Sequence, residues 1–233
     1  MPYIQLHSID VQHTLLRFVA TFLALIFVSQ NAMAIEEPSF KVVAKSGTYE
    51  LRQYAPMLVA ETLVDGDMDD ASSIGFRKIA DYIFGNNQVQ TGANSAKIAM
   101  TAPVTMEPQS QKIAMTAPVA LMPTESIGAS KQWRVHFVMP SQYTLNTIPK
   151  PKNPDVKLRE IPGKIFAVNT FTGFNTQSRV QAKTDELLLW VGQKNLKTLG
   201  QAQLARYDPP WTLPMFRRNE VMIEVEDVKE PSK

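Results

Sequence analysis

The chain contains no cysteine, and only three of its 233 residues are histidine. The absence of cysteine excludes disulfides, thiolate ligands for haem, iron–sulfur clusters or zinc, and a lipid on an N-terminal cysteine. Two of the histidines, His7 and His13, precede the segment that we expect to fold, which leaves His136. A catalytic triad needs a base beside its nucleophile, and a zinc site needs three or four ligands. The composition therefore predicts a protein that is not an enzyme and binds no metal ion itself.

The chain also lacks a large excess of one charge, because it has 24 lysines and arginines and 22 aspartates and glutamates, which gives a net charge of +2. A nucleic-acid-binding surface needs a concentrated basic face, so nucleic acid is not an expected partner. The clustered acids Asp65, Asp67, Asp69 and Asp70 lack the glycine and glutamate spacing of a calcium-binding EF-hand loop. We interpret them as turn and helix-capping residues.

Long apolar runs are scarce, and the most apolar one, residues 18–28, is short for a bilayer span, which takes about 20 apolar residues. Arg17 precedes this run, and the small-residue site Ala32-Met33-Ala34 follows it. This order predicts a secretory signal peptide, residues 1–34, cleaved after Ala34. We then expect a periplasmic or otherwise exported protein with no stable membrane span after cleavage. The alternative is an uncleaved N-terminal anchor.

The phrase Lys-Ile-Ala-Met-Thr-Ala-Pro-Val occurs twice, at residues 97–104 and 112–119. Read as strands, both copies alternate apolar residues on one face, and an antiparallel hairpin about residues 107–112 would pair Met106 with Ile113 and Val104 with Met115. In this register Met100 and Met115 are core residues rather than soft metal ligands. Proline has no N–H, so Pro103 and Pro118 predict a sheet edge or a local irregularity.

A weaker repeat divides the rest of the chain. A shift of 107 residues superposes Leu51 on Leu158, Arg52 on Arg159, Ala60 on Ala167 and Gly66 on Gly173. Each half is predicted to run strand, strand, helix, strand, strand, which indicates an α+β fold. The predicted helices are residues 71–84, capped by Asp69 or Asp70 and stopped at Gly85, and residues 177–194, capped by Asn175 or Thr176. The predicted strands, besides the hairpin, are residues 49–54, 57–63, 133–139, 156–161, 164–171, 203–207 and 220–226.

His136 lies on the predicted strand 133–139. Trp133, Val135 and Phe137 alternate with it and form the apolar face, so we expect His136 to face solvent beside Arg134. A solvent-facing strand histidine is the preferred interpretation over an iron ligand.

Five motifs occur in order along the chain. They are the doubled Met-Thr-Ala-Pro-Val, then Tyr49-Glu50-Leu51-Arg52, residues 133–140 (Trp-Arg-Val-His-Phe-Val-Met-Pro), residues 207–211 (Tyr-Asp-Pro-Pro-Trp), and residues 217–221 (Arg-Arg-Asn-Glu-Val). Together they resemble the SOUL/haem-binding protein family over roughly residues 40–225. The resemblance implies a distorted antiparallel β-barrel flanked by two helices, with a pseudo-twofold repeat of the strand-strand-helix-strand-strand unit. It bounds the domain at residues 35–226, followed by a flexible tail at 227–233.

The resemblance also implies a site, because members of this family bind haem or other tetrapyrroles in an apolar groove between the first helix and the loop before the last strand. The residues of this chain that match it are Ser73, Phe76, Arg77, Ala80, Phe84, Trp211, Leu213 and Met215. Porphyrin binding requires a large apolar contact and a cation near the propionates, and Arg77 or Lys78 would supply this cation. The chain departs from the family pattern at three places. Residues 58–60 are apolar where some members carry a proposed axial histidine. Ser73 stands where an arginine is found on the helix, and Thr212 or Leu213 stands where a lysine is found on the loop.

Three functions follow as hypotheses. The first is an exported, non-enzymatic monomer that binds haem or a related tetrapyrrole without histidine ligation. The second is a general binding module for a small amphiphilic ligand with no haem role. The third, an enzyme acting on a tetrapyrrole or lipid, has no residue to support it beyond the groove. For the motif at residues 217–220, a buried polar network is preferred over anion binding at the groove.

Overall fold

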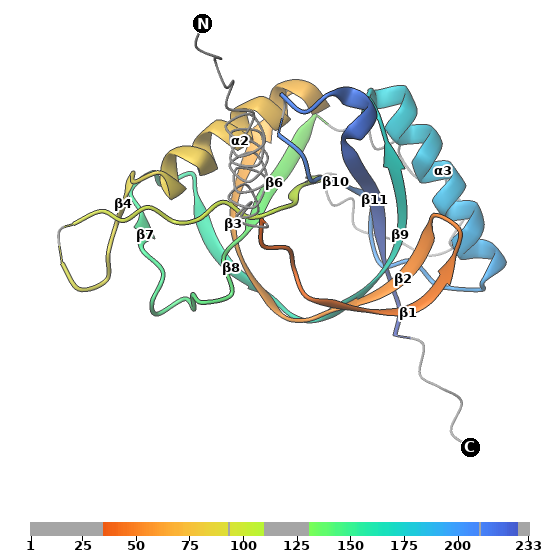
Figure 1. The fold of residues 1–233 in the computed structure, drawn as a ribbon, viewed down its shortest axis with the longest axis horizontal. Coiled ribbons are helices and arrows are strands. Elements are labelled where there is room, and N and C mark those ends of the chain that lie inside the picture. The colour runs from red at the N-terminus through yellow and green to blue at the C-terminus, as the bar shows by residue number, and fades with distance from the viewer. Residues whose placement is uncertain (1–34, 93, 110–130, 210, 228–233) are drawn as a thin grey trace, which may run out of the picture. The chain divides into compact units, whose positions relative to one another are not determined.

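The computed structural model describes residues 35–92, 94–109, 131–209 and 211–227, and from Glu36 onwards they belong to one compact unit. Its main feature is a nine-stranded antiparallel sheet in the order β1-β2-β9-β11-β10-β5-β6-β3-β8 (Figure 1). The nine strands are β1 (Phe40–Ser46), β2 (Tyr49–Tyr54), β3 (Met57–Asp65), β5 (Val104–Pro108), β6 (Gln132–Val138), β8 (Lys157–Ile161), β9 (Lys164–Thr172), β10 (Gln203–Arg206) and β11 (Arg218–Val225). Two short strands, β4 (Asn87–Gln88) and β7 (Lys150–Pro151), pair separately.

The predicted pseudo-twofold repeat is confirmed. The counterparts in the two halves are β2 and β8, β3 and β9, β5 and β10, and β6 and β11. When β1 is left out and every strand is replaced by its counterpart, the sheet order is the same as the original order read from the other end. β3 and β9 each have nine residues, and their bounds differ by the shift of 107 residues found in the sequence. The halves are cross-paired, because β2 pairs with β9 and β3 pairs with β8. The expected α+β distorted barrel with two helices is therefore the observed fold.

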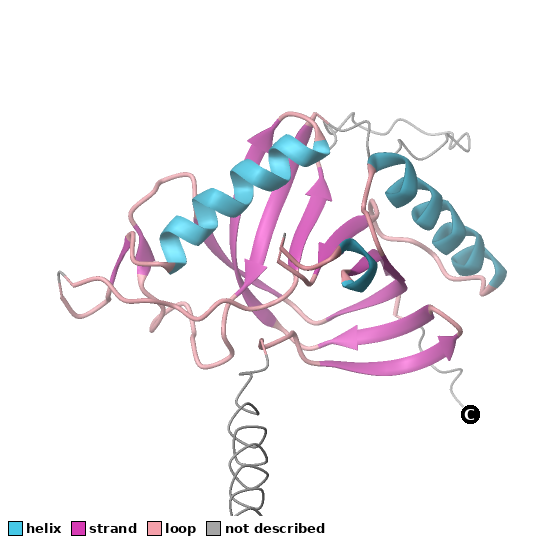
Figure 2. Cartoon of the chain, turned by 45° about the horizontal axis from the view of Figure 1, so that its top comes forward, coloured by secondary structure: helices cyan, strands magenta, loops and turns pink. Residues whose placement is uncertain are grey.

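The two helices are α2 (Met68–Ile83) and α3 (Gln177–Gln193), and both lie on one face of the sheet, which we call the helix face (Figure 2). The predicted start of the first helix was three residues late, because the side chain of Asp67 is the N-cap and accepts from the backbone N–H groups of Asp69 and Asp70. Thr176, one of the two expected caps, begins α3. None of the helices in the described ranges is long and apolar enough to cross a membrane.

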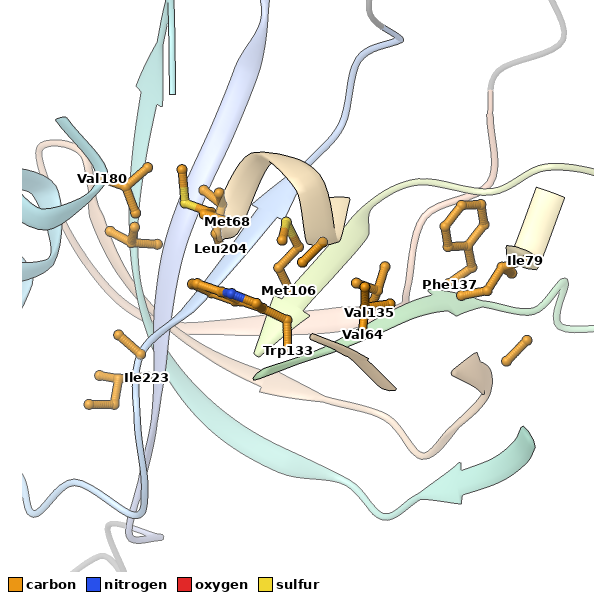
Figure 3. Close-up of a cluster of buried hydrophobic side chains, with 14 of the residues drawn as sticks. Val64, Met68, Ile79, Met106, Trp133, Val135, Phe137, Val180, Leu204 and Ile223 are labelled. Atoms are coloured by element: carbon orange, nitrogen blue, oxygen red, sulfur yellow. The ribbon is translucent and has the colours of Figure 1, made fainter. Parts of the chain in front are cut away.

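The main core fills the space between the helix face and the two helices (Figure 3). Trp133, Val135 and Phe137 of β6 are fully buried there, as their alternation predicts, together with Met106 of β5 and Leu204 of β10. Met100, expected in the core, is half-buried and packs against its edge.

The hairpin predicted from the doubled phrase is wrong at Val104 and Met106. Both edges of β5 are already occupied there, because Val104 pairs with Phe137 and Arg206, and Met106 pairs with Val135 and Leu204. A strand has two edges, so no place remains for the second copy beside these residues. The strand begins after Pro103, which fits the expected irregularity, yet β5 is central rather than an edge. The second copy, including Met115, lies outside the described residues, as do the expected signal peptide and the tail from residue 228.

The prediction that His136 faces solvent is also wrong. Its side chain does point away from the helices, but the residue is only 6% exposed. The reason is that side chains from eight of the nine strands surround a common cavity on this second face, so the sheet curls around it. We call this second face the inner face. The alternation of apolar residues along β6 identified correctly the face on which His136 lies, but it could not reveal that the sheet curls around this face.

Candidate functional site

A groove of about 350 Å³ lies on the helix face, between the N-terminal half of α2 and the connection from β10 to β11. Phe76 and Val104 give it an apolar floor, and Phe76 is held in place against Phe137, with ring centroids 5.5 Å apart. Pro209 adds an apolar patch on the connection side. Its volume is at the lower end of the range for ligand-binding pockets.

Arg206 is the cation that sequence reasoning missed. It ends β10 and lines the groove, and its side chain is 19% exposed. One guanidinium nitrogen donates to the hydroxyl of Ser72, and Nη2 lies 3.6 Å from the carboxylate of Asp69. Nε and Nη2 have no hydrogen-bond partner among the described residues. Burial lowers the pKa of Arg206, and the opposing charge of Asp69 offsets this only in part.

The connection side of the groove is fixed by hydrogen bonds to the backbone. The backbone N–H of Arg218 donates to the carboxylate of Asp208 at 2.6 Å, and Nε of Arg217 donates to the carbonyl of Thr212 at 2.7 Å. Asn175, before α3, donates to the side chain of Asn219 at 3.1 Å. These bonds place Asp208, Arg217 and Asn219 in the groove wall.

Of the eight residues predicted for the site, the structure brings three together in the groove: Ser73, Phe76 and Arg77. Arg77 is exposed and makes no hydrogen bond or ion pair with any residue in the described ranges. Ala80 instead packs in the core, and Phe84 lies beyond the end of α2, 56% exposed.

The three predicted loop residues do not line the groove. Trp211, Leu213 and Met215 are 81%, 58% and 64% exposed, and Phe216 beside them is 68% exposed. They belong to the apolar segment 211–216, which includes a 3₁₀ turn at Pro214–Phe216, whereas Pro209 and Arg217 on either side of it do line the groove. A short segment with four large exposed apolar side chains beside a groove is typical of a binding surface.

The motif at residues 217–220 divides between two environments. Glu220 is 2% exposed on the inner face and accepts hydrogen bonds from Arg52 at 2.8 and 3.1 Å and from Tyr207 at 2.7 Å. This is the expected buried polar network. Arg217 and Asn219 point instead to the groove. The alternation of a strand thus separates a structural residue from two groove residues within one motif.

These features define a class of protein: an α+β domain built from two cross-paired repeats, with a ligand-sized groove beside its first helix. The chain belongs to the SOUL heme-binding protein family, whose model matches residues 35–112 and 105–224. It is 29% identical over 157 residues to Heme-binding protein 2 of Homo sapiens and 28% identical over 153 residues to that of Mus musculus. Each match covers 64% of this chain and 66% or 65% of the relative, slightly less than two thirds of its length.

Two solved structures share the fold at low identity. The C-terminal domain of EcmrR is 12% identical with a TM-score of 0.53, covering 77% of this chain and 98% of that domain. An uncharacterised conserved protein from Listeria innocua is 12% identical with a TM-score of 0.51, covering 78% and 94%. At this identity the likeness concerns the fold alone.

Proposed function

We propose that this protein is a non-enzymatic binding protein for haem or a related tetrapyrrole, and that the ligand lies in the α2 groove without a histidine ligand. Family membership and the name of the two mammalian relatives support the ligand class. The observation that carries the proposal is Arg206, a mostly buried guanidinium beside an apolar floor, whose Nε and Nη2 have no hydrogen-bond partner among the described residues.

The chemistry of the ligand fits these walls. A tetrapyrrole has a large apolar plane and two carboxylates at one edge, so it gains from aromatic contact and from charge-assisted hydrogen bonds. Phe76 offers the apolar contact, while Arg206 and Arg77 offer the bonds to propionates. The apolar segment 211–216 is available to cover the part of the plane that a groove of about 350 Å³ leaves outside.

The absence of histidine ligation is supported by the position of His136. The groove is on the helix face, and His136 is on the inner face, so the β-sheet lies between them. The strand residues 58–60, where some relatives carry a proposed axial histidine, are Leu58, Val59 and Ala60, and all three are buried.

Absorbance titration with hemin tests this proposal. We expect a saturable Soret shift at one hemin per chain. Arg206→Gln should weaken binding about tenfold, because hydrogen bonds to charged groups contribute about 1.5–3 kcal/mol. Arg77→Gln should weaken it less, because Arg77 is exposed. The matched control is Lys78→Gln, since Lys78 is the neighbouring residue and pairs outside the groove with Asp155 at 2.8 Å.

Two further variants separate the groove from other sites. Trp211→Ala should cost about 1–3 kcal/mol of binding if the indole covers the macrocycle. His136→Gln should leave the Soret band unchanged. Loss of the band in His136→Gln, or wild-type affinity in both the Arg206 and Trp211 variants, would show that the groove is not the haem site.

We also propose that the protein is exported, cleaved after Ala34, and monomeric. The order of Arg17, the apolar run and the Ala-x-Ala site supports export. Intact mass of material from the cell envelope decides it, because a species that retains residues 1–34 contradicts cleavage.

A further inference from the structure

The inner face of the sheet encloses a cavity of about 160 Å³ that shares no lining residue with the groove. Eight of the nine strands contribute to its wall. Part of the wall is apolar, including Met57, Ile161 and Phe166, and part is polar, including His136 and Arg159. A cavity of roughly 150 Å³ is large enough for a benzene-sized molecule, and it is far too small for a tetrapyrrole.

His136 is the unexplained residue in this wall. Its Nδ1 has no hydrogen-bond partner among the described residues, although the side chain is more than nine-tenths buried. A buried polar atom without a partner costs about 1–3 kcal/mol, so such atoms call for a partner.

A comparison along one row of the sheet shows which partner is missing. The registers place Glu61, His136, Thr105, Ala205 and Glu220 side by side across the inner face. His136 and Glu220 are each one strand away from the central pair Thr105–Ala205. Glu220 brings a carboxylate that several donors bind. His136 brings none, so the carboxylate on its side of the row is that of Glu61 on the next strand, which two arginines share.

The charges around His136 also favour an acceptor with negative charge. Among the described residues, the cavity wall contains three cations, Arg134, Arg159 and Lys164, and one anion, Glu107. Lys164 pairs with Glu224 outside the wall, so the two arginines carry the charge that faces His136. Glu61, beside the wall, accepts from Arg159 at 2.7 Å, but it is 3.6 Å from Nε of Arg134, which has no hydrogen-bond partner in the described part of the chain. Two guanidinium groups therefore have more N–H donors than the two nearby carboxylates satisfy.

We propose that the inner cavity is a second binding site, for a small organic carboxylate with a body about the size of a benzene ring. The carboxylate bonds Arg134, Arg159 and His136, and the ring contacts the apolar wall. The charged end of the cavity is open to the ligand, because the side chains of Arg159 and Glu107 are 41% and 29% exposed.

Benzoate is the probe, with benzamide as its neutral isostere and benzamidine as its cationic one. Binding to the full chain is measured by calorimetry and by NMR of the histidine rings, with the His136 signals assigned by their absence in a His136 variant. We expect saturable binding of benzoate, a shift of the His136 ring signals, and no saturable binding of the other two. Absence of benzoate binding, or equal binding of benzamide or benzamidine, overturns the proposal.

Variants locate the probe. His136→Phe removes the Nδ1 group and narrows the cavity, and it should abolish benzoate binding. Arg159→Gln changes a partly exposed side chain and should weaken binding about tenfold without unfolding the chain. Lys157→Gln, which removes a positive charge from the same strand outside the cavity wall, should change affinity less than about twofold. Benzoate binding that Arg159→Gln leaves intact, or that hemin displaces, places the probe elsewhere and overturns the assignment.

Discussion

Arg52 and Arg159 occupy equivalent positions of the two repeats, yet they have opposite roles. The side chain of Arg52 is 6% exposed and bonds Glu220, Glu50 and Tyr54. Burial lowers the pKa of Arg52, but the interactions with Glu220 and Tyr54 together outweigh burial and raise it overall. The side chain of Arg159 is 41% exposed and bonds only Glu61 within the described chain. The same residue therefore stabilises the fold where its partners enclose it and is available to a ligand where they do not.

The largest expected difference between the two repeats concerns the carboxylates that pair with these arginines, Glu220 with Arg52 and Glu61 with Arg159. Glu220→Gln leaves the charge of Arg52 buried without compensation and should cost about 3–5 kcal/mol of unfolding free energy. Glu61→Gln should cost about 1 kcal/mol, because both of its arginine partners keep access to water. Urea denaturation of the two variants measures this. Equal losses would mean that the two clusters are equally structural.

The two helices should also respond differently to one added methyl group. A Cβ at Gly75 of α2 would lie 2.6 Å from the side chain of Val135, so Gly75→Ala should destabilise by about 1–3 kcal/mol. At Gly192 of α3 no atom of the described residues lies within 4 Å of an added Cβ, so Gly192→Ala should stabilise by about 0.5–1 kcal/mol. Thermal denaturation compares them. The Gly75→Ala penalty should shrink in a Val135→Ala background, and a constant penalty would rule out the contact as its cause.

The last expected difference is a dependence on pH that only the half with Arg159 and His136 should show. Burial, with the charges of Arg159 and Arg134, lowers the pKa of His136 from 6.5 to about 3. Below pH 6.5 the unfolded chain takes up a proton that the folded chain does not, so unfolding free energy falls as pH falls, by up to about 1.4 kcal/mol per pH unit. Between pH 6.5 and 5, His136→Gln should lose this slope. An unchanged slope would mean that His136 titrates normally in the folded protein.

The sequence predicts the fold better than the site, for a physical reason. Apolar alternation and the 107-residue shift are local properties of strands and helices, and they identified β2, β3, β8, β9 and both helices within a few residues. The hairpin failed because β6 takes one edge of β5 and β10, about 100 residues later in the chain, takes the other, which leaves no edge for the second copy. No local pattern reveals a competitor so distant in the sequence.

The site residues show the same limit. Ser73, Phe76 and Arg77 could be placed because helical spacing puts them on one strip of α2. Arg206 could not, since an arginine at the end of a short strand has no pattern that points to a groove. The burial of His136 depends on the curl of the entire sheet, which alternation along one strand does not record.

The cross-pairing of the two repeats has a consequence for how the chain folds. A single repeat, made alone, would keep β2, β3 and β5 with one open edge each, since their outer neighbours β9, β8 and β10 all come from the other repeat. Open edges pair with whatever strand is available, and a second copy of the same repeat offers matching ones. Neither repeat is therefore expected to fold by itself, because each depends on strands of the other to cover its open edges.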